Sequence, residues 1–334
     1  MEKVSVLVAV HNAENTLKRC LDSLIHQSIS GVQIICIDDA STDASMSILR
    51  EYKYRHDNVE IVALERNQGQ AKARNQGIPL IRAPFTAFLD SDDYMAPDAL
   101  EKAINVFEEH HETDCVLLDV RYIYPDKKEH GYRTPPFVSM SGYDAFIKAL
   151  RWDVHGWYVA RTHLYRQFPF DDSCHSYSDD NVTMAHYLHS REVRCCSGKY
   201  FFVQNDSSCT HQITARRFEW LKANMSMHRQ LTAWKMKKEV IDIYEEQRWY
   251  VLLDCFWFYH RHRGRLSEQD RDYALKTMRE AWKDIDTRTC LPGRVKHKLG
   301  YMPLKWSWTL FRWQEWVLYM LRKLKYDADG NRKK

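Results

Sequence analysis

The first 125 residues of this 334-residue chain predict an α/β fold, with a parallel β-sheet covered by helices. Two observations carry the prediction. Apolar segments of strand length alternate with amphipathic segments of helix length, and this order requires crossover connections between parallel strands. Three of the apolar segments also end abruptly at polar residues, as strands do where a ligand binds at the carboxyl edge of an open sheet.

The expected elements follow one another in a regular order. Short apolar runs predict strands over residues 4–10, 32–37, 59–64, 85–89 and 115–124. Helical spacing of apolar residues predicts a helix over residues 14–26. A second helix ends near His56 and can be capped by Ser41 or Thr42. A third follows the turn Asn67-Gln68-Gly69 and runs to about Ile81.

The pattern changes near residue 125. From about residue 127, aromatic and histidine residues interleave with polar ones, which is typical of short irregular elements around a variable pocket. Residues 215–286 have a helical pattern, and Ser267 and Asp270 stand where a partial capping box requires them. No internal repeat or low-complexity linker separates the parts, so the change predicts two halves of one domain.

Three polar clusters stand at the ends of the predicted strands: His11-Asn12, Asp38-Asp39 and Asp90-Ser91-Asp92-Asp93. In a parallel sheet these ends lie on one edge and converge on one crevice. Clustered carboxylates repel one another unless a cation compensates them, and Mg²⁺ and Mn²⁺ take oxygen ligands that they share with substrate phosphates. The last cluster therefore predicts a metal–diphosphate site, with an Asx-rich turn before the helix near Pro97 as the alternative.

Several other classes of protein are disfavoured by what the sequence lacks. No G-x-G-x-x-G follows the first strand and no P-loop is present, which argues against a dinucleotide-binding dehydrogenase and a P-loop enzyme. The nine cysteines include no C-x-x-C pair, so we expect reduced thiols rather than a zinc site. We expect no signal peptide, because the apolar run over residues 4–10 ends at His11 and lacks a basic leader. We expect no membrane-spanning helix, because no window of sufficient length is free of charge.

The first part of the chain contains four stretches in this order: VSVLVAVHNAENTLKRCLDSLIHQS, IICIDDASTDAS, ERNQGQAKARNQGI and AFLDSDDYM. Together they resemble the inverting family 2 glycosyltransferases, whose nucleotide-sugar-binding fold is called GT-A. The family usually has Tyr where this chain has His11. The resemblance implies a GT-A domain over residues 1–214, with a nucleotide-binding half (1–125) and an acceptor half (126–214). A helical extension (215–290) would follow.

The resemblance also implies a binding site for a uridine diphosphate sugar. Asp39 would accept the uracil N3–H, Gly69 would permit a turn, and either Lys72 or Arg74 would face the nucleotide. The implied donor-binding residues are Ala9, Val10, His11, Asn12, Glu14, Asp39, Gly69, Lys72, Arg74, Asp90 and Ser91.

The implied metal site is the D-x-D of Asp90 and Asp92, which would hold Mn²⁺ or Mg²⁺. Asp92 is the expected direct ligand, Asp90 lies nearer the ribose, and Asp93 stands behind them. His211 is a further candidate ligand, with an ordinary surface or core histidine as the alternative.

Inverting transfer also needs a carboxylate that accepts the proton of the attacking hydroxyl. The family commonly supplies it from an acidic pair at the start of a helix. Asp179-Asp180 fits that description, and we assign the base to Asp180, with Asp179 as the second candidate and an ordinary N-cap as the alternative.

The implied function is metal-dependent transfer of a hexosyl or N-acetylhexosaminyl group from a UDP-sugar. The acceptor would be a hydroxyl of a glycan or lipid-linked oligosaccharide, in the synthesis of capsule, exopolysaccharide or lipopolysaccharide. The rival interpretation is a non-catalytic adaptor that binds a membrane or nucleic acid through the carboxy-terminal segment. It leaves the acidic strand ends unexplained, and we expect no nucleic-acid partner.

The carboxy-terminal segment, residues 291–334, is basic and amphipathic. Residues 294–325 contain eight Lys or Arg and one acid, Glu315, a net charge of +7. Helical spacing places one apolar face along Trp313, Trp316, Val317, Met320, Leu321 and Leu324. Such a face with cations around it is typical of an interfacial helix on anionic lipid, which predicts a cytoplasmic protein bound peripherally to the inner face of the cell membrane. The alternative is a helix packed on the protein body.

Overall fold

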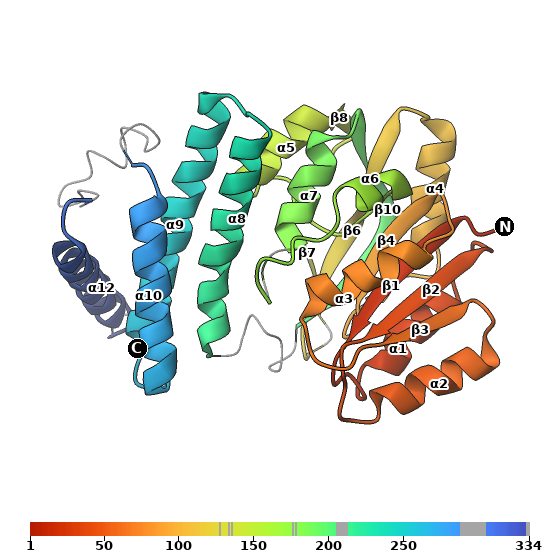
Figure 1. Ribbon diagram of the computed structural model, residues 1–334, viewed down its shortest axis with the longest axis horizontal. Coiled ribbons are helices and arrows are strands. Elements are labelled where there is room, and N and C mark those ends of the chain that lie inside the picture. The colour runs from red at the N-terminus through yellow and green to blue at the C-terminus, as the bar shows by residue number, and fades with distance from the viewer. Residues whose placement is uncertain are drawn as a thin grey trace. The chain divides into compact units, whose positions relative to one another are not determined.

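The computed structural model describes residues 1–126, 128–132, 134, 136–175, 177, 179–204, 213–287 and 305–331. The chain forms two compact units, Met1–Ser208 and Cys209–Lys334. Unit 1 is built around a mixed β-sheet, and the described part of unit 2 is helical (Figure 1).

The described residues of unit 1 form a ten-stranded sheet that begins with the four predicted parallel strands. These are β3 (Val59–Ala63), β2 (Val32–Asp38), β1 (Val4–Val10) and β4 (Phe85–Asp90), side by side in that order (Figure 1). The predicted α/β fold with a parallel first half is thus confirmed, and the strand bounds agree within one residue.

The sheet continues from β4 into the second half of unit 1. The order is β9 (Tyr158–Arg161), β6 (Thr113–Ile123), β10 (Glu192–Val203) and β5 (Tyr94–Met95), while β7 (Glu129–Gly131) pairs with β6 and β8 (Ser139–Ser141) with β10. β9 is antiparallel to both of its neighbours, and β10 is parallel to β6. One sheet therefore runs through both halves.

The strand register brings the polar strand ends to the same level. Val10 of β1 lies opposite Asp38 of β2, and Ala9 of β1 lies opposite Asp90 of β4. The chain therefore leaves all three strands at one edge of the sheet, as the sequence predicts for the carboxyl ends of parallel strands.

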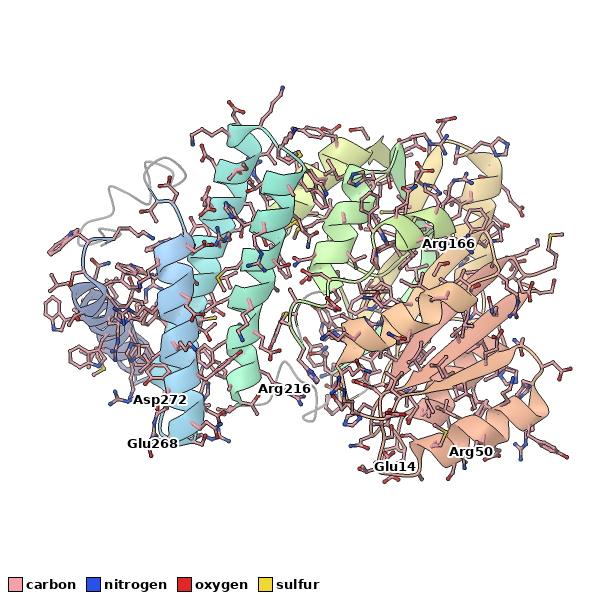
Figure 2. All side chains as sticks on the ribbon, in the orientation of Figure 1. Glu14, Arg50, Arg166, Arg216, Glu268 and Asp272 are labelled. Carbon is pink, nitrogen blue, oxygen red and sulfur yellow. The ribbon has the colours of Figure 1, made fainter. Side chains whose placement is uncertain are left out.

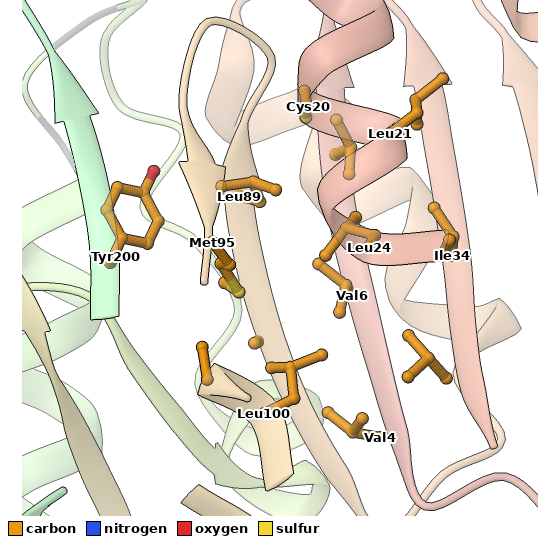
Figure 3. Packing of buried hydrophobic residues seen from close by; sticks show 14 of the residues in the cluster. Val4, Val6, Cys20, Leu21, Leu24, Ile34, Leu89, Met95, Leu100 and Tyr200 are labelled. Atoms are coloured by element: carbon orange, nitrogen blue, oxygen red, sulfur yellow. The ribbon is translucent and has the colours of Figure 1, made fainter. Parts of the chain in front are cut away.

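Helices cover both faces of this sheet. The helices of unit 1 are α1 (Leu17–Ile25), α2 (Ser45–Arg55), α3 (Gln70–Gly77), α4 (Ala99–Glu109), α5 (Gly142–Leu150), α6 (Thr162–Gln167) and α7 (Asp179–Leu188), with a 3₁₀ turn η1 (Ile78–Leu80) after α3. Val4, Val6 and Ile34 share a core with Leu21 and Leu24 of α1 (Figure 3).

The opposite face of the sheet receives α3 at close range. A Cβ on Gly77 would lie 2.8 Å from the Leu7 side chain and 2.9 Å from that of Ile37, so a glycine lets the helix approach the strands. Successive strand residues alternate between faces, which is why Leu7 meets α3 while Val6 meets α1.

Two helix ends differ from the sequence-based expectation. Residues 14–26 and the stretch up to Ile81 were predicted as whole helices, but α1 starts at Leu17, and α3 passes at Gly77 into the 3₁₀ turn that contains Pro79. The predicted cap by Ser41 or Thr42 is wrong, because α2 starts only at Ser45. Its N-cap residue is Ala44, whose side chain cannot form a capping hydrogen bond.

Unit 2 confirms the helical pattern predicted for residues 215–286. Its described elements are η2 (Ala215–Phe218), α8 (Glu219–Ala233), α9 (Lys238–His262), α10 (Glu268–Asp284) and α12 (Trp308–Asn331). Ser267 Oγ accepts the backbone N–H of Asp270 at 3.1 Å, which is the predicted cap of α10.

Buried charges tie α9 to its neighbours within unit 2. The Arg248 guanidinium pairs with Glu245 of its own helix and with Asp284 at the end of α10. His228 of α8 contacts Glu245 at 2.9 Å, and the backbone N–H of Asp286 donates to the same carboxylate at 2.9 Å. Because Glu245 and Arg248 are both buried, each compensates the charge of the other.

Helix α12 packs on α9 and α10 through aromatic residues that lie off the predicted apolar face. Phe311 is buried against Trp249 and Phe256, with ring centroids 5.3 and 5.2 Å away. One turn apart along the same side, Glu315 is buried and Tyr319 stacks on His260 at 5.6 Å. The side of the helix at spacing i, i+4, i+8 is therefore the one that holds it in place.

Four of the six residues on the predicted apolar face of α12 are exposed, and Val317 and Met320 are partly buried. Trp313 is 62 % exposed and Leu324 62 %, and Trp316 and Leu321 are exposed as well. Leu310, one turn before Trp313, belongs to the same exposed side. Within the described residues, no helix is both long enough and apolar enough to cross a membrane.

Glu315 makes the packing of α12 sensitive to pH. Only 2 % of this residue is exposed, and burial raises the pKa of its carboxyl from the ordinary 4.5 to about 7. A raised folded-state pKa means that the stabilisation is complete below pH 4.5 and is lost as the pH rises toward 7, where the buried group becomes charged.

We expect Glu315→Gln to raise the free energy of unfolding at pH 8 by about 1–3 kcal/mol and to change it little at pH 4.5, because the neutral amide avoids the buried charge. Denaturant unfolding of the full chain at both pH values measures this. The control is Glu280→Gln at an exposed position of α10, which should be neutral at both. An equal gain at both pH values would refute the role of ionisation.

Candidate functional site

The loops that follow β1 and β2 are joined by hydrogen bonds at the edge of the sheet. Asn12, with a φ of +51°, accepts the backbone N–H of Thr42 through its side-chain oxygen at 2.8 Å. Its own N–H donates to Ser41 Oγ at 3.1 Å. Ser41 and Thr42, expected to cap a helix, instead bind the loop after β1.

Glu14, two residues after Asn12, also binds the loop after β2 (Figure 2). Its backbone N–H donates to Asp43 Oδ2 at 3.0 Å, and its carboxylate accepts the N–H of Ala44 at 2.9 Å. A carboxylate at this point is favourable because the start of α2 carries unsatisfied N–H groups and the positive end of the helix dipole. Glu14 thus caps α2, and its predicted part in donor binding stays a prediction.

His11 and Asp39 lie together between these loops. The His11 Nδ1–H donates to the backbone oxygen of Asp39 at 2.8 Å, because a carbonyl can only accept. That bond leaves Nε2 as the acceptor, and the Asn12 amide donates to it at 3.2 Å. The ring at the position where the family has Tyr is therefore held with a fixed tautomer.

The Asp39 carboxylate holds the turn before α3. It is buried, and its two oxygens accept the backbone N–H groups of Gln68 at 2.7 Å and Gly69 at 2.8 Å. Gly69 has a φ of +89°, and a Cβ there would lie 2.9 Å from the His175 ring. Because each carboxylate oxygen has a second lone pair, Asp39 retains the capacity to accept a further N–H from a ligand.

Arg74 and Lys72 have different surroundings, which the sequence left open. Lys72 is exposed on α3, whereas Arg74 is completely buried and pairs with Asp90 at the end of β4. Its guanidinium lies 4.7 Å from the Phe88 ring centroid and 5.2 Å from that of Phe170. Within the described residues its Nε and Nη1 have no hydrogen-bond partner.

The carboxylates after β4 have three different environments. Asp90 is partly buried beside Arg74, and Asp92 is partly exposed in the turn. Asp93 is fully buried and accepts the Tyr200 O–H at 2.8 Å and the Val203 N–H at 2.7 Å. Burial, and then the charges of Asp90 and Asp92, raise the pKa of Asp93 well above its ordinary value. Asp93 thus joins the end of β4 to β10.

Asp90 and Asp92 offer oxygen donors at this edge, which suits a hard cation that takes its other ligands from phosphates and water. Among the described residues, no three His, Cys, Asp or Glu side chains cluster as a complete metal site. The third predicted ligand, His211, lies outside the described residues. The donor set therefore fits Mg²⁺ or Mn²⁺ shared with a substrate, rather than a cation held by protein alone.

The acidic pair predicted to supply the base begins helix α7. Burial, and then the charge of Asp180, raise the pKa of Asp179 to about 6, while the Arg74 cation opposes this and Asp90 adds to it. The start of α7 therefore lies in the same electrostatic environment as the Arg74–Asp90 pair, some 90 residues away in sequence.

A histidine that the sequence did not single out contacts the second member of this pair. His155 Nε2 bonds to Asp180 Oδ1, and His155 Nδ1 bonds to the Tyr132 hydroxyl. The only sequence signal near it is the interleaving of His155, Gly156 and Trp157, which is not specific. Trp157 itself stacks on Tyr200 at 4.5 Å, and Trp152 on His155 at 4.9 Å.

Comparison with known proteins agrees with this geometry. The family model described as Glycosyl transferase family 2 matches residues 5–173, just over half of the chain. The poly(ribitol-phosphate) beta-glucosyltransferase of Bacillus spizizenii is 37% identical over 118 residues, 34% of this chain and 18% of that protein. The minor teichoic acid biosynthesis protein GgaA of Bacillus subtilis is 29% identical over 215 residues, 59% of this chain and 46% of that protein. The chain thus spans less than half the length of either relative.

Among solved structures, S. aureus TarS 1–349 in complex with UDP-GlcNAc superimposes with a TM-score of 0.65. The match covers 85% of this chain and 82% of that one at 19% identity. This likeness identifies the GT-A fold expected from the sequence. With the family match over residues 5–173, it follows that the chain belongs to glycosyl transferase family 2.

Proposed function

We propose that this chain is a metal-dependent inverting glycosyltransferase that moves a sugar from a UDP-sugar to a hydroxyl group of a cell-surface glycan or its lipid-linked precursor. The observation that carries the proposal is the shared environment of the Asp179–Asp180 pair and the Arg74–Asp90 pair at the edge of the sheet. The names of the two relatives, a poly(ribitol-phosphate) beta-glucosyltransferase and a minor teichoic acid biosynthesis protein, support the choice of polymer class. The UDP-GlcNAc bound to TarS supports the choice of donor.

The nucleotide would lie across the ends of β1, β2 and β4. Asp39 has lone pairs left to accept the uracil N3–H, and Ala9, Val10 and His11 lie at the end of β1 beside it. Asp90 is oriented by Arg74, and Ser91 follows it in the turn. Asp92 and Asp90 would hold Mg²⁺ or Mn²⁺, which when bound supplies positive charge against the departing diphosphate.

The reaction would be a single displacement at the anomeric carbon. The acceptor hydroxyl attacks opposite the diphosphate, so one C–O bond forms as the other breaks, and the anomeric configuration inverts. Asp180 takes the hydroxyl proton as general base. Asp179, adjacent and with a raised pKa, is the second candidate.

Asp180→Asn is expected to lower turnover by about 10²–10⁴-fold, because the amide cannot accept the proton. UDP affinity should stay within about threefold of the wild type, since the donor edge is untouched. UDP release from a panel of UDP-sugars, with calorimetry for UDP binding, measures both. Asp172→Asn, an exposed carboxylate nearby, is the control. Retained turnover in Asp180→Asn would assign the base elsewhere.

Asp92→Ala is expected to weaken UDP binding at least about tenfold in Mn²⁺ or Mg²⁺, because a cation shared with the diphosphate loses a ligand. In EDTA the wild type and the variant should bind equally weakly. Calorimetry with and without the metal tests this, with the exposed Asp57→Ala as control. No UDP binding by the wild type under any condition would favour the adaptor interpretation.

We also propose that the exposed side of α12 lies on an anionic membrane, where a lipid-linked acceptor would reside. Trp313, Leu321 and Leu324 are exposed on that side. Transfer of their apolar surface from water into a membrane would be favourable. Glu315, the one acid of residues 294–325, is buried. Residues 294–325 carry a net charge of +7 and Lys323 is exposed, which suits anionic headgroups.

The double substitution Trp313→Ser/Leu321→Ser is expected to reduce binding to phosphatidylglycerol-containing vesicles at least about tenfold, through the loss of insertable apolar area. Co-sedimentation of the full chain with these vesicles and with phosphatidylcholine vesicles measures it. Tyr54→Ser, at an exposed aromatic of α2, is the control. Undiminished binding by the double variant, or no preference for the anionic vesicles, would contradict the proposal.

A further inference from the structure

The side chain of His155 is held by polar contacts at both ring nitrogens. Nε2 contacts Asp180 Oδ1, and Nδ1 contacts the hydroxyl of Tyr132. All three residues are partly or largely removed from solvent, with 24 % of the His155 side chain and 19 % of the Asp180 side chain exposed. The three groups come from the loop after β7, the loop before β9 and the start of α7.

The ring of His155 is also clamped on its faces and at its backbone. Trp152 stacks on it at 4.9 Å and Tyr132 at 5.7 Å, both nearly parallel to it. The backbone N–H of His155 donates to Thr134 Oγ1 at 2.8 Å, and the Thr134 hydroxyl donates back to the His155 carbonyl at 2.5 Å. A side chain fixed in so many directions is suited to orienting another group.

The chemistry of the contacts determines their direction. An ionised carboxylate can only accept, so Nε2–H donates to Asp180. In the neutral ring Nδ1 is then an acceptor, and the Tyr132 O–H donates to it. The hydrogen bonds thus run in one direction, from Tyr132 through His155 to Asp180. Within the described part of the chain only Oδ1 of Asp180 is bonded, so Oδ2 is the oxygen that can receive a proton.

We propose that His155 is a positioning residue for the base: it donates to one oxygen of Asp180 and so turns the other toward the acceptor hydroxyl, while Tyr132 fixes the tautomer. The inference rests on the proposed function. In the transfer step the hydroxyl proton passes to Oδ2 of Asp180 as the bond between sugar and diphosphate breaks. His155 transfers no proton in this step, and its protonation state is the same before and after it.

Three variants separate orientation from packing. His155→Phe keeps a planar ring between Trp152 and Tyr132 but removes both nitrogens. His155→Gln loses the ring but restores an N–H donor toward Asp180. Tyr132→Phe removes only the hydroxyl that sets the tautomer. Each is assayed by UDP release from the donor that the wild type accepts in a panel of UDP-sugars, with water or an added acceptor as nucleophile.

We expect His155→Phe to lower kcat about 10–100-fold while donor KM and UDP affinity stay within about twofold. His155→Gln should recover at least about threefold over the Phe variant, and Tyr132→Phe should lose about 3–10-fold. In the background of Asp180→Asn, His155→Phe should have no further effect, because the group it orients is absent.

The pH dependence gives an independent readout. His155→Phe should change the pH profile of the rate, whereas a purely structural role would leave its shape unaltered, because the hydrogen bond between His155 and the base is lost. The other ionisable groups around the pair, Asp179, Arg74, Asp90 and Tyr132, are unaltered in this variant.

Two results would overturn the inference alone: wild-type kcat and pH profile in His155→Phe, or a further loss when His155→Phe is added to Asp180→Asn. A fall in kcat together with UDP affinity, with the Gln variant no better than the Phe variant, would also overturn it in favour of a structural role. A wild type that binds UDP but releases it from no UDP-sugar would overturn the proposed function as well, which distinguishes the two failures.

Discussion

The ion pair between the buried Arg74 and the partly buried Asp90 is the interaction on which the rest of the candidate site depends. A fully buried guanidinium is costly unless a carboxylate compensates it, and the acidic edge after β4 is costly without a cation. The ion pair therefore compensates both charges. Removing Arg74 would take away the cation that pairs with Asp90 beside Asp92 and Asp93, and would also raise the proton affinity of Asp179 further. One side chain therefore sets the charge balance of both the donor edge and the start of α7.

Much of the fold could be predicted from sequence because its signals are local. The valines of β1 and the apolar run of β4 define strands by composition, and parallel pairing then brings their ends to one edge. The caps were harder, because Ser41 and Thr42 have the right chemistry for a helix start but bind Asn12 across the loops instead. That choice depends on the register of two strands, which no local pattern contains.

The environment of the site residues was less predictable than their identity. The acidic motif and the pair before α7 could be found as patterns, but which carboxylate is buried, paired or exposed depends on residues far away in the chain. Tyr200 and Val203, more than 100 residues away in the sequence, donate the hydrogen bonds that the buried Asp93 accepts. Likewise, nothing in the sequence joins Tyr132, His155 and Asp180. In α12 the residues that blur the predicted face, Phe311 and Tyr319, are those that pack, and this leaves the regular face exposed.

Asp179 and Asp180 are adjacent in sequence but do not have equivalent surroundings, and that difference bears on which of them accepts the proton. Their charges repel, so a proton on one makes the ionised form of the other easier to maintain. Burial and this repulsion raise the pKa of Asp179 to about 6, so that carboxyl holds its proton more tightly than usual. Asp180 accepts a hydrogen bond from His155, which fixes the orientation of its carboxylate. A base must present an oxygen to the hydroxyl that it deprotonates. The contact with His155 orients Asp180 for this, and no equivalent contact is present at Asp179 within the described residues.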